Sequence, residues 1–173
     1  MKLRKLCQCA MFVALLVICA WLSVPTPQGA LTLQTFGVFL TLGLLGGKWG
    51  CAAIGSYLML GVIGLPVFSG FQGGVGILLG ATGGYLFGFM AAGLLFWLIT
   101  RLYPKGVLLS MVSGLLCCYL AGTFWYCLVF LPGNTPVSFV SALASCVLPY
   151  LLPDAVKLAL AFFLTSRLKR FVY

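Results

Sequence analysis

The sequence predicts an all-α integral membrane protein with six transmembrane helices in a single domain, residues 1–173. Hydrophobic residues make up 63% of the chain and charged residues only 6%, so a water-soluble globule would lack the polar residues to cover its surface. The chain has ten Lys and Arg residues and one acidic residue. Nearly all of these cations lie beside the ends of apolar runs rather than among polar neighbours. This placement favours a lipid bilayer as the partner and argues against nucleic acid.

Six apolar segments are long enough to be considered as spans, since a spanning helix needs about 20 mostly apolar residues. They are residues 6–24, 31–47, 49–65, 80–100, 107–131 and about 147–166. The first follows basic residues, as in a signal peptide, but its apolar run exceeds the usual signal length of about 7–15 residues. We therefore expect it to be a span. The second and third are short and glycine-rich, which favours tight packing against neighbouring helices.

Lysine and arginine alternate between the two predicted sides of the membrane. With an even number of spans and a cytoplasmic start, the inner segments hold Lys2, Arg4, Lys5, Lys48, Arg101, Lys105, Arg167, Lys169 and Arg170. The three predicted outer connections, residues 25–30, 66–79 and 132–146, contain no Lys or Arg. Because cytoplasmic loops carry the excess of cations, both termini are predicted to be cytoplasmic in a multi-pass protein of the cell membrane.

A glycine-rich outer loop is predicted between the third and fourth spans. Irregular backbone at membrane depth is tolerated only where protein or water shields it from lipid, so we expect residues 68–74 to cover a cavity. Glycines that would allow close backbone approach or positive φ are Gly73, Gly74, Gly83 and Gly84. Apolar walls would come from Phe68, Phe71 and Tyr85. The alternative, favoured for Gly80, Gly84 and Gly88, is that the glycines only allow close helix packing.

Asp154 and Lys157 are the only charged residues inside a predicted span. A charge at the bilayer centre costs about 2.5 to 3.5 kcal/mol on insertion scales, so such a residue indicates a functional site. Their spacing places both on one helical face, where they can pair or line a cavity together. Pro153 is predicted to open the last helix, which would put Asp154 in its first turn. The alternative is an internal ion pair that only fixes packing.

The sequence gives little support for a catalytic, metal or nucleotide site. With one acid and no His, the chain lacks the paired groups that hydrolysis or proton transfer requires, so we predict no catalytic residues. The eight cysteines form no CxxC pair and are expected to be packing residues, so no metal site or cofactor is predicted. No P-loop is present to bind nucleotide phosphates. Further polar candidates for a binding pocket are Gln34, Thr35 and Gln72, with ordinary interhelical hydrogen bonds as the alternative.

Four motifs in order along the chain give a family resemblance. TLQTFGVFL (32–40), GLPVFSG (64–70), GATGGYLFGF (80–89) and LPDAVKLALA (152–161) resemble the BioY family of biotin transporters, the substrate-binding S components of energy-coupling-factor systems. The resemblance covers nearly the whole chain. It implies a high-affinity subunit that captures biotin in an outward-facing pocket. Delivery would require an energy-coupling-factor transmembrane subunit and two ATP-binding subunits.

The resemblance also implies roles for particular residues. Asp154 and Lys157 match the family motif of the last helix, and a Gly-Gly-Tyr motif matches Gly83, Gly84 and Tyr85. An Ala-xxx-Ala pair that contacts the coupling subunit matches Ala10 and Ala14, whereas Ala81 stands where family members usually have proline. An aspartate can accept a hydrogen bond from the ureido N–H groups of biotin, and a lysine can donate to a carbonyl or a carboxylate.

Three other functions stay open at this point. The chain could be an S component for another small vitamin, or a structural membrane protein with an internal Asp–Lys pair. A passive channel would require a continuous polar stripe through several helices, which the sequence does not show.

Overall fold

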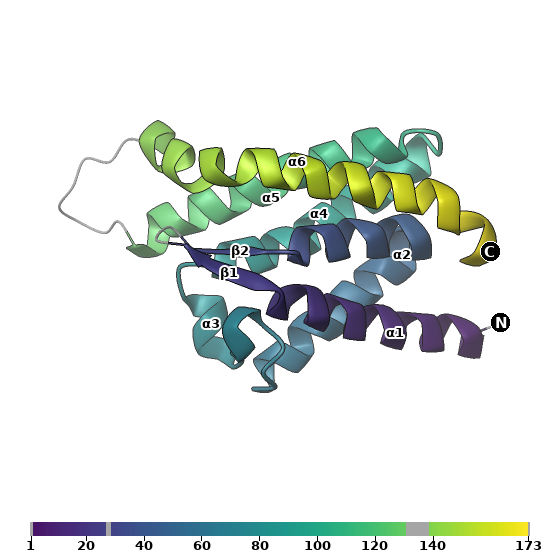
Figure 1. The fold of residues 1–173 in the computed structure, drawn as a ribbon, viewed down its shortest axis with the longest axis horizontal. Helices are drawn as coiled ribbons and strands as arrows, with labels where there is room; N and C mark the ends of the chain where they lie inside the picture. The colour runs from purple at the N-terminus through teal and green to yellow at the C-terminus, as the bar shows by residue number, and fades with distance from the viewer. Residues whose placement is uncertain (1, 27–28, 131–138, 173) are drawn as a thin grey trace.

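The computed structural model describes residues 2–26, 29–130 and 139–172, which form a helical bundle with one small β-hairpin (Figure 1). The elements are α1 (Lys2–Trp21), β1 (Ser23–Thr26), β2 (Gly29–Thr32), α2 (Gln34–Val62), η1 (Ser69–Phe71), α3 (Val75–Leu79), α4 (Gly83–Leu102), α5 (Val107–Phe130) and α6 (Phe139–Val172). Within these residues, 5 helices are long and apolar enough to cross a membrane. The predicted all-α membrane class is confirmed, and the number of candidate spans is one fewer than predicted.

The missing span is explained by α2, which covers most of both the second and the third predicted segments. Gly46 interrupts the helix with φ 78° and ψ 170°, a conformation that glycine adopts readily because it lacks a Cβ. In Figure 1 the α2 ribbon runs from the hairpin to the end of the bundle where the N- and C-termini lie, and then returns. A Cβ added to Gly50 would lie 3.0 Å from the Cα of Leu42, so the two arms touch beside the turn. The predicted reversal therefore occurs without a separating loop.

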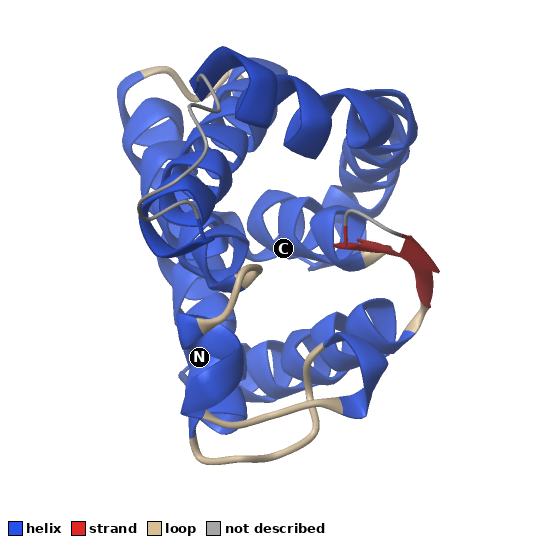
Figure 2. Ribbon diagram, turned by 90° about the vertical axis from the view of Figure 1, so that its left-hand side faces the viewer, coloured by secondary structure: helices blue, strands red, loops and turns tan. Residues whose placement is uncertain are grey.

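The hairpin and α6 also differ from prediction. β1 and β2 pair antiparallel, with Ser23 opposite Thr32, where the sequence predicts the end of one span and a plain connection at 25–30 (Figure 2). α6 begins at Phe139, so the described part of the predicted connection 132–146 is helical, and residues 131–138 lie outside the described residues. The prediction that Pro153 opens the last helix is wrong, because Pro153 lies inside α6. Asp154 is therefore not stabilised by a helix N-terminus.

Helix packing positions the elements around a cavity at one end of the bundle. α4 packs against α5, and α2 packs against α1, α4 and α6. Small residues allow close crossings, since a Cβ on Gly88 would lie 3.1 Å from the Cα of Cys118 on α5. Side chains from three helices fill the centre of the bundle, with Leu16, Leu42, Ile54 and Met111 fully buried. The bundle is therefore closed in its middle, and the open volume lies nearer the hairpin.

Candidate binding site

A cavity of about 610 Å³ lies among the end of α1, the hairpin, the start of α2, the η1 segment, and α4, α5 and α6. In Figure 1 the hairpin and α3 lie at the end of the bundle away from both termini. The volume of the cavity is within the range of small-molecule sites, about 300 to 1,000 Å³. Apolar side chains such as Leu86, Phe89 and Leu115 share the wall with a few polar groups. This composition suits a small ligand with both an apolar body and hydrogen-bonding groups.

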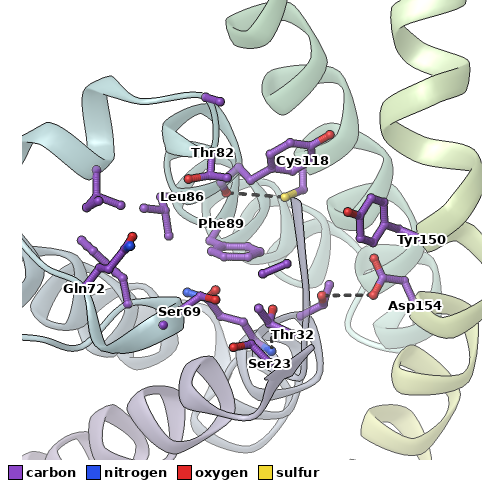
Figure 3. A pocket seen from close by; sticks show the side chains of 18 of the residues that line it. Ser23, Thr32, Ser69, Gln72, Thr82, Leu86, Phe89, Cys118, Tyr150 and Asp154 are labelled. Carbon is purple, nitrogen blue, oxygen red and sulfur yellow. Dashed lines mark hydrogen bonds between the residues drawn. The ribbon is translucent and has the colours of Figure 1, made fainter. Parts of the chain in front are cut away.

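The Asp154 carboxylate, the single acidic side chain of the protein, lines the cavity (Figure 3). The Lys157 Nζ donates to its Oδ1 at 2.7 Å, and the Thr35 hydroxyl donates to the same oxygen at 3.2 Å. The Tyr119 hydroxyl donates to Oδ2 at 2.8 Å. Asp154 and Lys157 are only 5% and 8% exposed, and α2, α5 and α6 each contribute a partner. A buried charge of this kind is tolerated because it is both paired and hydrogen-bonded.

A second polar contact joins α2 to the segment that follows it. The Gln34 side-chain amide donates to the Tyr57 hydroxyl at 2.7 Å, and this hydroxyl donates to the Val67 carbonyl at 3.1 Å. The Tyr57 and Phe68 rings meet edge to face, with centroids 5.7 Å apart. Gln34 and Phe68 both line the cavity. Side-chain contacts thus join the two arms of α2 to residues 67–68, which lead into η1.

The η1 segment borders the cavity beside the end of α1. Phe71 has φ 58°, a left-handed conformation that is unfavourable for a bulky side chain. Its ring lies against Trp21, with centroids 4.8 Å apart, and the Trp21 indole N–H donates to the Pro66 carbonyl at 2.8 Å. These contacts hold residues 66–72 against α1. The segment predicted to cover a cavity therefore does border one.

Comparison with known proteins identifies the family. The model of the BioY family matches residues 1–173. This chain belongs to the BioY family. It is 37% identical to the biotin transporter BioY of Thermotoga maritima, with 97% of each chain covered. It is 38% identical to the probable biotin transporter BioY of Pyrococcus horikoshii, with 98% of each chain covered.

The fold of this BioY family member also matches a solved structure, the S-component for biotin from an ECF-type ABC transporter. The TM-score is 0.85 at 26% identity, covering 98% of this chain and 92% of the other. The chain is therefore a multi-pass transport protein of the cell membrane rather than an enzyme, as the sequence predicts. Among the described residues, no group of His, Cys, Asp or Glu is placed to hold a metal ion.

The BioY fold brings together two thirds of the residues that the sequence analysis proposes for the pocket. Those that line the cavity are Gln34, Thr35, Phe68, Phe71, Gln72, Tyr85, Asp154 and Lys157. The other four, Gly73, Gly74, Gly83 and Gly84, do not line it. Ala10 and Ala14 lie outside the cavity on α1, where both are exposed.

The four glycines shape the backbone around the cavity. A Cβ on Gly83 would overlap the Leu78 carbonyl, and one on Gly84 would overlap the side chain of Trp125. Gly74 has φ 98°, which glycine adopts without steric cost. A Cβ on Gly73 would overlap the Leu65 carbonyl. Gly73, Gly83 and Gly84 therefore pack closely against neighbouring backbone or helices, as the packing alternative predicts for Gly84.

Several lining residues of this BioY family member escape the sequence analysis, notably Trp21, Cys118, Tyr119, Tyr126 and Tyr150. Figure 3 shows Tyr150 on the same wall as Asp154. A tyrosine within an apolar run is easily interpreted as a packing aromatic. The available signal is its hydroxyl, which needs a hydrogen-bonding partner when it is buried in a span. Applied to residues 107–131, this criterion selects Tyr119 and Tyr126.

Proposed function

We propose that this protein is the biotin-binding S component of an energy-coupling-factor importer. It binds biotin with high affinity in the cavity and delivers it through a transmembrane coupling subunit driven by two ATP-binding subunits. Membership of the BioY family supports this function, as do relatives named biotin transporters and the similar fold of a biotin S-component. Biotin is the transported ligand, and no cofactor is required.

The observation that carries the proposal is the Asp154–Lys157 pair in the cavity wall. It places a hydrogen-bond acceptor beside a donor, with 2.7 Å between the Asp154 Oδ1 and the Lys157 Nζ. The ureido ring of biotin has the complementary edge, an N–H donor beside a carbonyl acceptor. We propose that Asp154 accepts from a ureido N–H while Lys157 donates to the ureido carbonyl, because charged partners give the stronger hydrogen bonds.

The rest of the cavity suits the apolar ring and chain of biotin. Leu86 and Phe89 supply apolar wall, and Tyr85, Phe68 and Phe71 add aromatic surface. Gln34, Thr35 and Gln72 supply further hydrogen-bonding groups. In this proposal Gly73, Gly74, Gly83 and Gly84 act by shaping the wall and not by contacting the ligand.

The topology that this function requires has six passes in one domain and both termini in the cytoplasm. The two arms of α2 run in opposite directions and would supply the second and third passes (Figure 1). Each arm is shorter than the usual span of about 20 residues. In the most apolar 18-residue stretch of α2, 67% of the residues are buried inside the protein. The cations then lie on the inner side, and the glycine-rich segment 63–82 and the cavity face outward.

The coupling subunit would dock on α1. Ala10 and Ala14 are exposed and lie one helical turn apart, which permits close approach of a second backbone. Exposed Leu6 and Met11 widen the same helix surface. This surface is separate from the cavity, so docking and ligand binding can be changed independently.

Isothermal titration of the purified protein in detergent against a panel of vitamins tests the function. We expect saturable, stoichiometric binding of biotin and no comparable heat from the other vitamins. Tight binding of a different vitamin would instead assign the chain to another S-component specificity. The absence of binding for the whole panel would favour a structural role for the Asp154–Lys157 pair.

A further inference from the structure

We propose that Tyr119 is a positioning residue that leaves Asp154 with a single acceptor site for the ligand, and so restricts recognition to a group with one N–H at that point. The inference rests on the proposed function and concerns the same cavity. Tyr119 lies on α5 and lines the cavity beside Asp154. The residue is only 5% exposed, so packing and the hydrogen bond to Asp154 hold its hydroxyl in place.

The argument begins with the hydrogen-bonding capacity of the carboxylate. An ionised aspartate has about four lone-pair sites, two on each oxygen. Lys157 and Thr35 both donate to Oδ1 and fill its two sites. Tyr119 donates to Oδ2 and fills one more. Within the described residues, one site on Oδ2 is left for a ligand.

The donor side of the pair has capacity to spare. The Lys157 ammonium has three N–H donors and no acceptor. One donor is used on Asp154, its single hydrogen-bonding partner within the ranges that the structure describes. The ligand therefore meets one acceptor site and a cationic donor side by side. A neutral ureido edge fits this arrangement, whereas a guanidinium, which carries only donors and a positive charge, does not.

Removing the Tyr119 hydroxyl changes this count in a defined way. In Tyr119→Phe, Oδ2 has two free sites, and the carboxylate loses one of the three hydrogen bonds that hold it. The binding affinity for a group with several N–H donors then rises relative to the affinity for a ureido group. A merely structural role for Tyr119 would lower the affinity for both ligands by the same factor, so the ratio of the two affinities reports the positioning role.

The test uses biotin and 2-iminobiotin, in which a guanidinium replaces the ureido group. For Tyr119→Phe we expect biotin affinity to fall about tenfold, the usual scale for one hydrogen bond to a charged group. We expect the preference for biotin over 2-iminobiotin to fall about fivefold. Ser110→Ala is the matched control, because it removes a buried α5 hydroxyl that donates to the Gly106 carbonyl and lies outside the cavity lining. Its selectivity should equal that of the unmodified protein.

A spectroscopic measurement gives a second readout that does not depend on ligand binding. Asp154 is the only acidic residue of the chain, so protein labelled with side-chain ¹³C-carboxyl aspartate has one side-chain carboxyl resonance. Tyr119→Phe should shift this resonance in the ligand-free protein, and Ser110→Ala should not. Thr35→Val should shift it as well, and serves as the second variant if Tyr119→Phe does not fold.

The outcomes separate the inference from the proposed function. If the unmodified protein does not bind biotin, the proposed function fails, while the carboxyl resonance still tests the Tyr119 contact. If biotin binds but Tyr119→Phe leaves both the selectivity and the resonance unchanged, the positioning role is overturned. A tenfold loss of affinity with unchanged selectivity would also contradict it.

Discussion

Trp21 at the end of α1 holds Phe71 in the η1 segment, with ring centroids 4.8 Å apart and an angle of 32° between the rings. The Trp21 indole N–H also donates to the Pro66 carbonyl at 2.8 Å. Phe71 has φ 58°, and a non-glycine residue in the left-handed region persists only where its surroundings hold it. Both rings line the cavity. The helix proposed to dock on the coupling subunit is thus joined directly to the cavity border.

Trp21→Ala should release bound biotin faster, because it removes both the ring contact and the indole hydrogen bond. Each is worth about 0.5 to 1.5 kcal/mol, so the dissociation rate should rise about tenfold. Trp21→Phe keeps an aromatic ring and should have a smaller effect. The rate is measured by chasing labelled biotin from the purified protein. Equal dissociation rates for Trp21→Ala and the unmodified protein would show that this contact does not retain the ligand.

Gly83→Ala should lower the thermal stability, because the added methyl group would overlap the Leu78 carbonyl. Overpacking of this kind typically costs about 1 to 3 kcal/mol. Gly76→Ala is the matched control, since a Cβ there meets nothing within 4 Å, and it should be neutral or slightly stabilising. Unfolding midpoints in detergent give the comparison. A Gly83→Ala protein of normal stability that fails to bind biotin would instead indicate direct ligand contact.

Ala10→Leu combined with Ala14→Leu should reduce biotin uptake by cells that contain the coupling module, because two larger side chains hold the partner helix away. Biotin binding by the isolated protein should be unchanged, since both residues lie outside the cavity. Leu116→Phe, at an exposed position of α5, is the control and should leave uptake normal. If the double variant takes up biotin as well as the Leu116→Phe control does, this part of α1 is excluded from the interface.

Reporter fusions test the orientation. Because nine of the ten cations lie on the predicted inner side, green fluorescent protein should fluoresce when fused to either terminus. Alkaline phosphatase, which is active only outside the cytoplasm, should be inactive at both ends and active when inserted near Ser69 in the η1 segment. Active phosphatase at either terminus would contradict the six-pass topology.

Composition and charge predicted the membrane class and the two charged residues of the cavity, whereas the family was indicated by the resemblance of four motifs. Asp154 and Lys157 could be found because the chain is otherwise almost uncharged within its apolar runs, so any buried charge is conspicuous. The spacing of three residues predicted that the two side chains can pair or line a cavity together, and the structure shows the pair at 2.7 Å in the cavity wall.

Other features depend on tertiary contacts that no local pattern reveals. The hairpin has strands of only 4 residues, too short for a clear alternation of apolar and polar side chains. α6 continues through Pro149 and Pro153, although proline usually marks the end or start of a helix. The hydroxyl of Tyr119 marks it as a candidate polar group, but no local pattern reveals that its partner is Asp154, 35 residues away along the chain.

The single variant Asp154→Asn cannot separate binding from stability. It would leave the Lys157 ammonium buried without an anionic partner, and breaking a buried pair from one side costs about 3 to 5 kcal/mol. Both stability and biotin affinity would then fall. Replacement of both residues by apolar ones of similar shape avoids this problem, because it is often neutral or stabilising.

The most direct measurement is therefore biotin binding by a folded protein that carries Asp154→Leu and Lys157→Met together. We predict that this variant folds, although the Tyr119 and Thr35 hydroxyls lose their acceptor, and that it shows no biotin binding detectable by titration. Retained biotin affinity in this folded double variant would contradict the account, because the charged pair would then serve neither as acceptor nor as donor for the ligand.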